Sequence, residues 1–213
     1  MIAYLSGDPY ADTGLFLCLA DPDHLTHVLE LPINTDIPPV GTPILVATPR
    51  AAVLQERGLE TQMLVLQTEV TALHKRYPNI NGPCFEFAGG VDHQASGAPV
   101  IFAHNSDYVN HACACGIVSL SNFDGGHPLR PPPGTNWFSL AALLFPMMGF
   151  ETTWLPASGQ PETRDIADFV NRGIIKNFGT GRLEVYKVKG AADGPRRSRV
   201  VSPQWNSLNL PEP

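Results

Sequence analysis

Short apolar runs separated by turn-forming residues occupy the first third of the chain. They are "LFLCLA" (15–20), "HVLELPI" (27–33) and "PILVAT" (43–48), with "DPD" and "IPPVGTP" between them. Apolar runs of this length, bounded by Pro, Gly and Asp, are typical of β-strands that end in turns. The longer, partly alternating segment "TQMLVLQTEVTALHKR" (61–76) predicts a further strand, with a helix as the alternative.

Three segments have the spacing of amphipathic helices. "RAAVLQERG" (50–58) predicts a short helix that ends at its glycine, and "TNWFSLAALLFPMM" (135–148) predicts one behind a Thr/Asn cap that ends or kinks at Pro146. "QPETRDIADFVNRG" (160–173) is the clearest helical pattern. It has an early proline, acidic residues in its first turn and Gly173 as a stop signal.

The remaining segments predict the fold class and the domain organisation. Brief strands are expected at "CFEF", "APVIFA" and "GIVSL" within a region rich in Asn, Gly, His and Pro, and at "RLEVYKV" and "SRVVS" near the end. We therefore expect an α+β, β-rich fold with a mostly antiparallel sheet and a few helices in the C-terminal half. Residues 1–200 should form one domain with an irregular insertion at about 77–133, followed by a tail at 201–213.

Composition narrows the class of protein. Of the 213 residues 43% are hydrophobic and 16% charged, as in a globular chain, and 21 Pro with 19 Gly predict many short elements. The start lacks a basic segment and Asp8 interrupts it, so no signal peptide is expected. The best apolar run, "FSLAALLFPMMGF", is too short to span a membrane. Four unevenly spaced cysteines favour free thiols or metal ligands, so a cytoplasmic protein is expected.

The net charge of −6 conceals an uneven distribution. Residues 1–163 hold five basic and fifteen acidic side chains, whereas residues 164–200 hold nine basic and four acidic ones. Such asymmetry suggests that the C-terminal part binds an anionic partner. The alternative is that the two parts neutralise each other, or that a partner subunit does so.

A cluster of histidine and cysteine stands in "HNSDYVNHACACGIVSL" (104–120). A zinc site would take Cys113 and Cys115 with two further ligands, for which the candidates are Cys84, His93, His104, His111 and His127. Our candidate set is Cys84, His111, Cys113 and Cys115. The alternative is a strand with two small buried thiols on one face, because Cys-x-Cys lacks the usual two-residue spacing of zinc clips.

A catalytic thiol is a second candidate for the same region. Cys84 in "NGPCFEF" would be the nucleophile and His127 in "DGGHP" its base. The local sequence argues against this, because "CFEFAGG" is too short for the helix start that positions such a cysteine. His24 and His27 could act as acid or base near neutral pH, although isolated histidines beside a strand are more often structural.

A glycine pattern near the C-terminus, "RGIIKNFGTGRLEVYKV" (172–188), is the strongest functional feature. Its order of helix, glycines and strand disfavours a Rossmann dinucleotide site, and no Gly-Lys-Ser/Thr completes a P-loop. A tight hairpin or a helix stop with a bulge would also use these glycines. In a functional interpretation, the glycines let backbone N–H groups approach phosphates that Arg172, Lys176 and Arg182 also attract.

This segment resembles the C-terminal glycine-rich loop of the CRISPR-associated, RAMP-type RNA-binding proteins. The resemblance covers Gly173, Gly179, Gly181 and the flanking helix and strand, under a tenth of the chain. It implies a ferredoxin-like unit and contact with guide RNA. The sequence departs from that family in residues 1–130, which are acidic and in which two ferredoxin-like units cannot be traced.

The sequence therefore predicts a non-enzymatic, guide-RNA-binding subunit of a multi-protein complex. Its expected partners are RNA or another polyanion and other protein subunits, with no membrane, and no cofactor is expected unless the cysteine–histidine segment holds zinc. The alternatives are a zinc- or thiol-dependent enzyme, or zinc-stabilised module, at 84–127 and a structural assembly or shell subunit. The candidate nucleic-acid-binding residues are Arg172, Gly173, Lys176, Phe178, Gly179, Gly181, Arg182 and Lys187.

Overall fold

A computed structural model gives the fold of most of the chain. It describes residues 2–8, 13–18, 31–54, 58–78, 80, 82–91, 95–102, 112–121, 136–154, 160–187 and 196–208. Within these ranges the chain is strand-rich and almost entirely antiparallel, and the helices η3, α1 and α2 follow residue 144. The predicted β-rich, mostly antiparallel architecture with helices in the C-terminal half is thus confirmed for the described residues. None of the described helices is long and apolar enough to cross a membrane.

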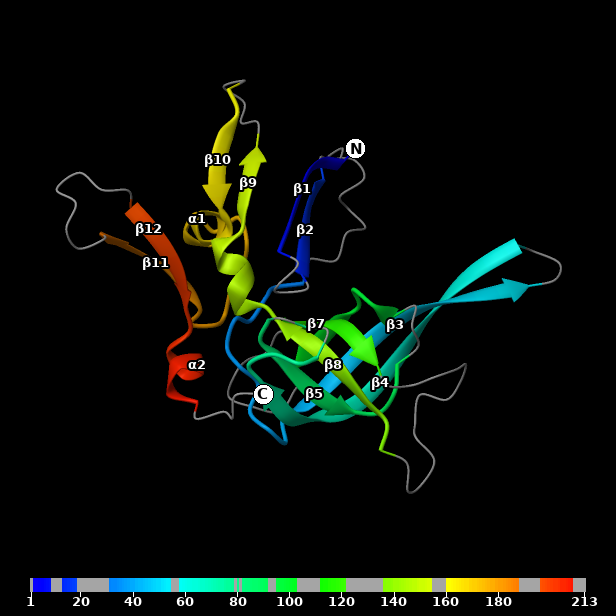
Figure 1. The fold of residues 1–213 in the computed structure, drawn as a ribbon. Coiled ribbons are helices and arrows are strands. Elements are labelled where there is room, and N and C mark those ends of the chain that lie inside the picture. The colour runs from blue at the N-terminus through cyan, green and yellow to red at the C-terminus, as the bar shows by residue number, and fades with distance from the viewer. Residues whose placement is uncertain are drawn as a thin grey trace.

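Six antiparallel strands close into a barrel in the order β3-β4-β5-β8-β7-β6 (Figure 1). The strands are β3 (Pro43–Leu54), β4 (Gly58–His74), β5 (Cys84–Ala88), β6 (Pro99–Phe102), β7 (Ala114–Ser121) and β8 (Phe138–Leu143). Side chains that alternate along these strands fill the interior, as a small barrel requires. The interior residues include Ile44, Val46, Leu66, Val70, Phe85, Phe87, Val100, Cys115, Ala141 and Leu143.

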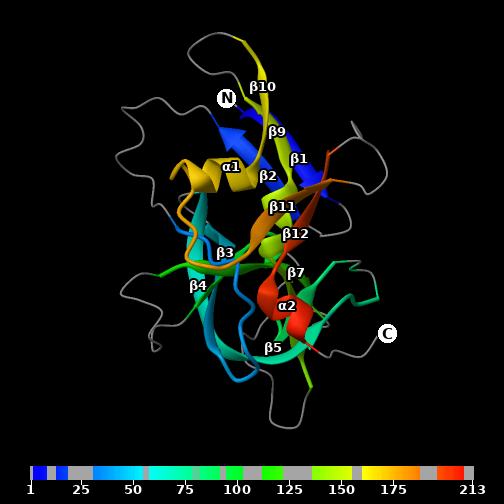
Figure 2. The ribbon, with the colours of Figure 1, turned by 90° about the vertical axis from the view of Figure 1, so that its left-hand side faces the viewer.

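Three two-stranded ribbons accompany the barrel. They are β1 (Ile2–Asp8) with β2 (Thr13–Cys18), β9 (Glu151–Trp154) with β10 (Glu162–Asp165), and β11 (Arg182–Lys187) with β12 (Arg196–Val201). Both ribbon views place all three at the same end of the barrel, together with the helix α1 (Ile166–Asn171) (Figures 1 and 2). A second apolar cluster at this end joins α1 to the 3-10 helix η3 (Phe145–Gly149) and the base of β11–β12.

Residues 77–133 were expected to be an irregular insertion. Instead, β5, β6 and β7 fall within them and supply three of the six barrel strands. The brief strands predicted at "CFEF", "APVIFA" and "GIVSL" are confirmed. The described strands of this region therefore contribute to the hydrophobic core.

The helix predicted at 135–148 is wrong. Residues 138–143 form β8, and the chain turns helical only in η3, where Pro146 lies in the first turn. Ala141 and Leu143 point into the barrel, whereas Leu140 packs in a separate cluster with Ile80. A strand buried on both faces is continuously apolar, and such a run matches helical spacing by chance.

The short helix predicted at 50–58 is also wrong. Residues 50–54 continue β3 and pair with residues 58–62 of β4, from Arg50↔Gln62 to Leu54↔Gly58. The predicted strand at 61–76 is confirmed by β4. Pairing with β4 overrides the weak helical propensity of residues 50–54. The predicted helix at 160–173 is partly confirmed, because α1 begins only at Ile166. Asp165 caps its N-terminus, where the Asp165 carboxylate accepts a hydrogen bond from Asp168 N at 2.7 Å.

The expected tail is part of the fold as far as the structure describes it. Residues Pro203–Ser207 form the helix α2, and the Trp205 ring lies 5.6 Å from that of Phe145. The side chain of Gln204 accepts a hydrogen bond from Ile37 N at 2.9 Å. Helix α2 thus packs against the hydrophobic core beside the barrel.

Candidate polyanion-binding surface and the cysteine segment

The glycine loop, residues 172–182, runs beside residues 33–36. In the sequence, residues 33–36 precede the six barrel strands and the glycine loop follows them. Ile33 N donates to Lys176 O at 2.9 Å, and Phe178 N donates to Ile33 O at 3.0 Å. These two bonds form a short parallel bridge between Ile33 and Asn177. The loop is therefore attached to a segment that precedes it by more than 140 residues.

Side chains reinforce this attachment. Asn177 Oδ1 accepts from Thr35 N at 3.2 Å and from Gly179 N at 2.9 Å. Asp36 Oδ1 accepts from both the amide and the hydroxyl of Thr180, at 2.7 and 2.6 Å. Gly181 N donates to Thr35 Oγ1 at 3.0 Å. The four successive amides from residue 178 to residue 181 thus all donate to acceptors within the protein.

Gly179 and Gly181 are required by packing against Thr35. A Cβ on Gly179 would lie 2.3 Å from Thr35 N, and one on Gly181 would lie 2.7 Å from Thr35 Cβ. Gly173 has a different reason, since its φ of +72° is a left-handed conformation and nothing lies within 4 Å of its Cβ position. The close backbone approach that the glycines permit is to the protein's own residues 35 and 36.

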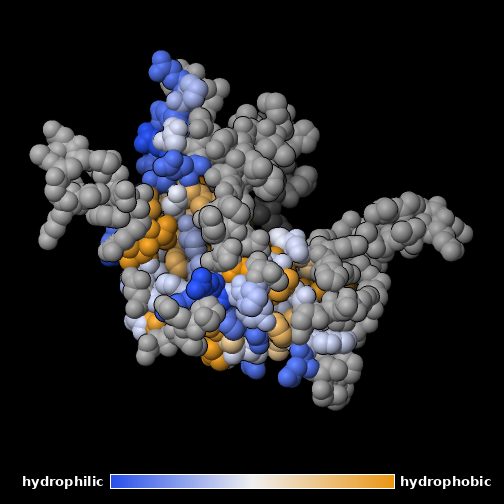
Figure 3. Space-filling model, viewed as in Figure 1, coloured by the Kyte–Doolittle hydropathy of each residue, from blue (hydrophilic) through white to orange (hydrophobic). Residues whose placement is uncertain are grey.

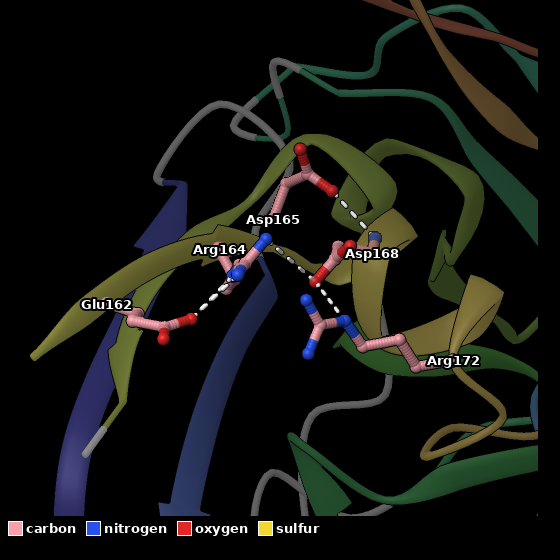
Figure 4. Close-up of polar contacts among 5 residues, drawn as sticks. All are labelled: Glu162, Arg164, Asp165, Asp168 and Arg172. Carbon is pink, nitrogen blue, oxygen red and sulfur yellow. Dashed lines mark hydrogen bonds and ion pairs between the residues drawn. The ribbon is translucent and has the colours of Figure 1, made fainter. Parts of the chain in front are cut away.

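Acidic neighbours partly balance the arginines around α1 (Figure 4). Arg172 Nε lies 2.9 Å from Asp168 Oδ2, and Arg164 lies 2.7 Å from Glu162 and 3.7 Å from Asp168. The hydrogen bond to Glu162 is the main cause that raises the pKa of Arg164. Arg172 therefore does not present an isolated positive charge.

The other predicted contact residues of the loop lie at the surface. Phe178 is 41% exposed, Lys176 is exposed, and the side chain of Arg182 is 62% exposed while pairing with Glu184 at 2.8 Å. Figure 3 shows hydrophilic residues over β10 and an apolar area below them, toward the base of β11–β12. Lys187 ends β11 and pairs with Arg196 in the ladder.

The three described cysteines are free and buried. Burial and, second, the charge of Glu86 raise the pKa of Cys84 to about 12. Burial also raises the pKa of Cys113 and of Cys115, whose thiol donates to Val100 O at 3.4 Å. At neutral pH these thiols stay protonated, so none of them is the thiolate that a nucleophile needs.

The structure separates two of the predicted zinc ligands, Cys84 and Cys115. Cys115 packs inside the barrel, whereas Cys84 packs in the outer cluster with Ile80 and Leu140, so the barrel wall separates them. Within the described ranges no group of three His, Cys, Asp or Glu side chains could hold a metal ion. Other predicted candidates lie outside the described residues, namely His24, His27, His93, His104, His111 and His127.

Two arrangements were not foreseen from the sequence. One is the group of Thr35, Asp36 and Asn177 described above. The sequence "NTD" (34–36) indicates only a local turn, in which Asn34 Oδ1 accepts from Asp36 N at 2.8 Å. The other is His74 Nε2, 3.6 Å from Glu86 Oε2 on the outer barrel wall and directly across the ladder from Cys84. Because Cys84 is fully buried, this group does not form an accessible catalytic site.

Comparison with known proteins does not assign the chain to a family. No protein-family model matches the chain, and no curated protein matches it.

Proposed function

We propose that the chain is a non-enzymatic, cytoplasmic subunit that binds RNA or another polyanion through the ribbon β11–β12. The ribbon holds five basic residues and one acidic residue, Glu184. The basic residues are Arg182, Lys187, Arg196, Arg197 and Arg199. Free, buried cysteines fit a reducing compartment.

The register of the ribbon carries the proposal. Leu183 pairs with Val200, and both pack in the apolar cluster with η3, so this face of the ribbon turns toward the core. Paired residues of an antiparallel ladder share a face, and successive pairs alternate between faces. By this alternation the ladder positions Glu184↔Arg199 and Tyr186↔Arg197 belong to the other face of the ribbon, as Arg182 does, whereas the position Lys187↔Arg196 belongs to the core-side face.

This arrangement is typical of a sequence-independent phosphate contact. Residues two apart on one strand lie about 6.7 Å apart, so arginines at positions 197 and 199 can contact successive phosphates. Tyr186, whose ladder partner is Arg197, adds an aromatic ring on which a base can stack. The acidic remainder of the chain, with fifteen acidic and five basic residues in 1–163, directs a polyanion toward this ribbon.

The glycine loop has a supporting role in this proposal. Its amides at positions 178–181 are already bonded within the protein, so side chains rather than backbone N–H groups contact the phosphates. Lys176 and Phe178 lie next to the ribbon along the chain and extend its surface. A guide RNA, other protein subunits and a ferredoxin-like unit are implied by the resemblance to the RAMP-type proteins alone, and the phosphate contact does not depend on them.

Two double variants test the proposal with equal changes in charge. Arg197→Ala with Arg199→Ala removes two cations from the ribbon, whereas Lys75→Ala with Arg76→Ala removes two from the segment directly after the barrel strand β4. For a single-stranded oligonucleotide, the ribbon variant should lower the slope of log K against log salt by about 1.4, since each phosphate contact contributes about 0.7. The loss should be the same for unrelated sequences.

The barrel variant is the control and should leave both the affinity and the salt dependence unchanged. Equal losses in the two variants would mean that net charge, not the ribbon, determines binding. Full binding by the ribbon variant would remove the proposal.

A further inference from the structure

The hairpin of β3 and β4 extends beyond the barrel as an arm, residues 48–54 and 58–64 (Figure 1). The two strands pair without interruption from Pro43↔Glu69 to Leu54↔Gly58. On the outer side, β6 pairs with β3 only at residues 44–46, and β5 pairs with β4 only at residues 70–74. No other described strand pairs with either edge of the arm.

An unaccompanied two-stranded ribbon of this length is only marginally stable in water. Each free edge also presents a row of backbone N–H and C=O groups, to which another strand can add. At about 3.3 Å per residue, the free edge of β4 from Gly58 to Leu66 is roughly 30 Å long. Val65, within this stretch, is apolar and 57% exposed. The arm thus has the properties of a surface that a further strand covers.

The two edges differ in their protection. Edge strands that stay unpaired are usually interrupted by proline or carry basic residues. β3 has both, in Pro49 and Arg50, and Pro49 has no N–H to donate. The β4 segment "GLETQMLVL" has no proline and no basic residue, and its one charge is Glu60. The free edge of β4 is therefore the one that can accept a strand.

We propose that this edge pairs antiparallel with the same edge of a second copy of the chain. Antiparallel pairing of one strand with itself is two-fold symmetric, so the contact closes as a dimer and joins the two arms into a four-stranded sheet. Glu60 lies near one end of the segment, so antiparallel pairing places the two carboxylates at opposite ends, roughly 13 Å apart. Parallel pairing in register would place them side by side.

A matched pair of lysine variants tests the contact, with the molecular mass measured by sedimentation. Thr61 pairs directly with Ala51 across the arm, so Thr61→Lys and Ala51→Lys add one charge to the same cross-strand pair. In the proposed dimer the two copies of residue 61 lie within about 10 Å of each other. The two copies of residue 51 are three strand spacings apart, about 15 Å. At that distance salt screens most of the repulsion between two lysine charges.

The unmodified chain should be a dimer, and Thr61→Lys should raise its dissociation constant roughly tenfold, whereas Ala51→Lys leaves it nearly unchanged. Thr61→Glu should weaken the dimer as well, and an equimolar mixture of the lysine and glutamate variants should restore it. Restoration also shows that both variants are folded. A monomeric unmodified chain, equal effects of the two lysines, or a mixture that fails to dimerise would overturn the proposal.

Discussion

Thr35 is the residue on which the glycine loop depends most. Its amide and its hydroxyl both bond to Asn177, and its hydroxyl also accepts from Gly181 N. Thr35 is 1% exposed, so any bond it loses would leave a buried polar group unsatisfied. A substitution at this single position therefore affects the loop, the strand β11 that follows and the basic ribbon.

Replacement of Gly179 by alanine tests this packing. Because the new Cβ would lie 2.3 Å from Thr35 N, we expect Gly179→Ala to lower the free energy of unfolding by about 3 kcal/mol. Gly173→Ala is the matched control. It has no steric neighbour and only a left-handed φ of +72°, so it should cost about 1 kcal/mol. Urea denaturation of both variants measures the difference, and equal costs would contradict the packing role.

The sequence predicted that these glycines matter but not why. Glycines that permit close backbone approach are recognisable in any sequence, whereas the group they approach is not. Here that group is residue 35, 144 residues before Gly179, and no local pattern signals the pairing. The same holds for the cysteines: the strand that "ACACG" suggests begins only at Ala114 and leaves Cys113 outside it, and only the fold shows that Cys84 lies across the barrel wall from Cys115.

At the scale of elements, strands were easier to predict than helices. The long segment at 61–76 was recognised as a strand because its β-branched residues and partial alternation extend over many positions. The segment at 135–148 matches the spacing of a helix because β8 is buried on both faces and shows no alternation. Burial on both faces is a property of the assembled barrel and cannot be read from the segment.

Helix α2 provides the element-scale prediction. Ending the chain after Val201 removes Trp205 from its contact with Phe145 and Gln204 from its bond to Ile37. We expect this truncation to cost at least about 3 kcal/mol of stability, as loss of a packed tryptophan does. Ending the chain after Leu208 retains all of these contacts and serves as the control. Thermal unfolding of both forms decides whether α2 is structural; equal melting temperatures would show that it is a tail.

At the scale of the whole molecule, the two proposed binding surfaces lie at different places on the barrel. The basic ribbon β11–β12 stands at the end of the barrel where α1 lies, and the arm of β3 and β4 leaves the barrel elsewhere (Figures 1 and 2). The uneven charge distribution was visible in the sequence, and the fold places five of the nine basic residues of 164–200 in one two-stranded ribbon. Barrel closure was not predictable, since it depends on pairings between β3 and β6 more than fifty residues apart.

Mapping of backbone amides by NMR during titration with a single-stranded homopolymeric RNA tests the polyanion-binding ribbon most directly. We expect the largest chemical-shift changes along Arg182–Lys187 and Arg196–Val201, with smaller changes at the internally bonded amides of residues 178–181. These changes should disappear at high salt. Changes concentrated on the barrel strands, or on the amides of residues 178–181 alone, would contradict this expectation.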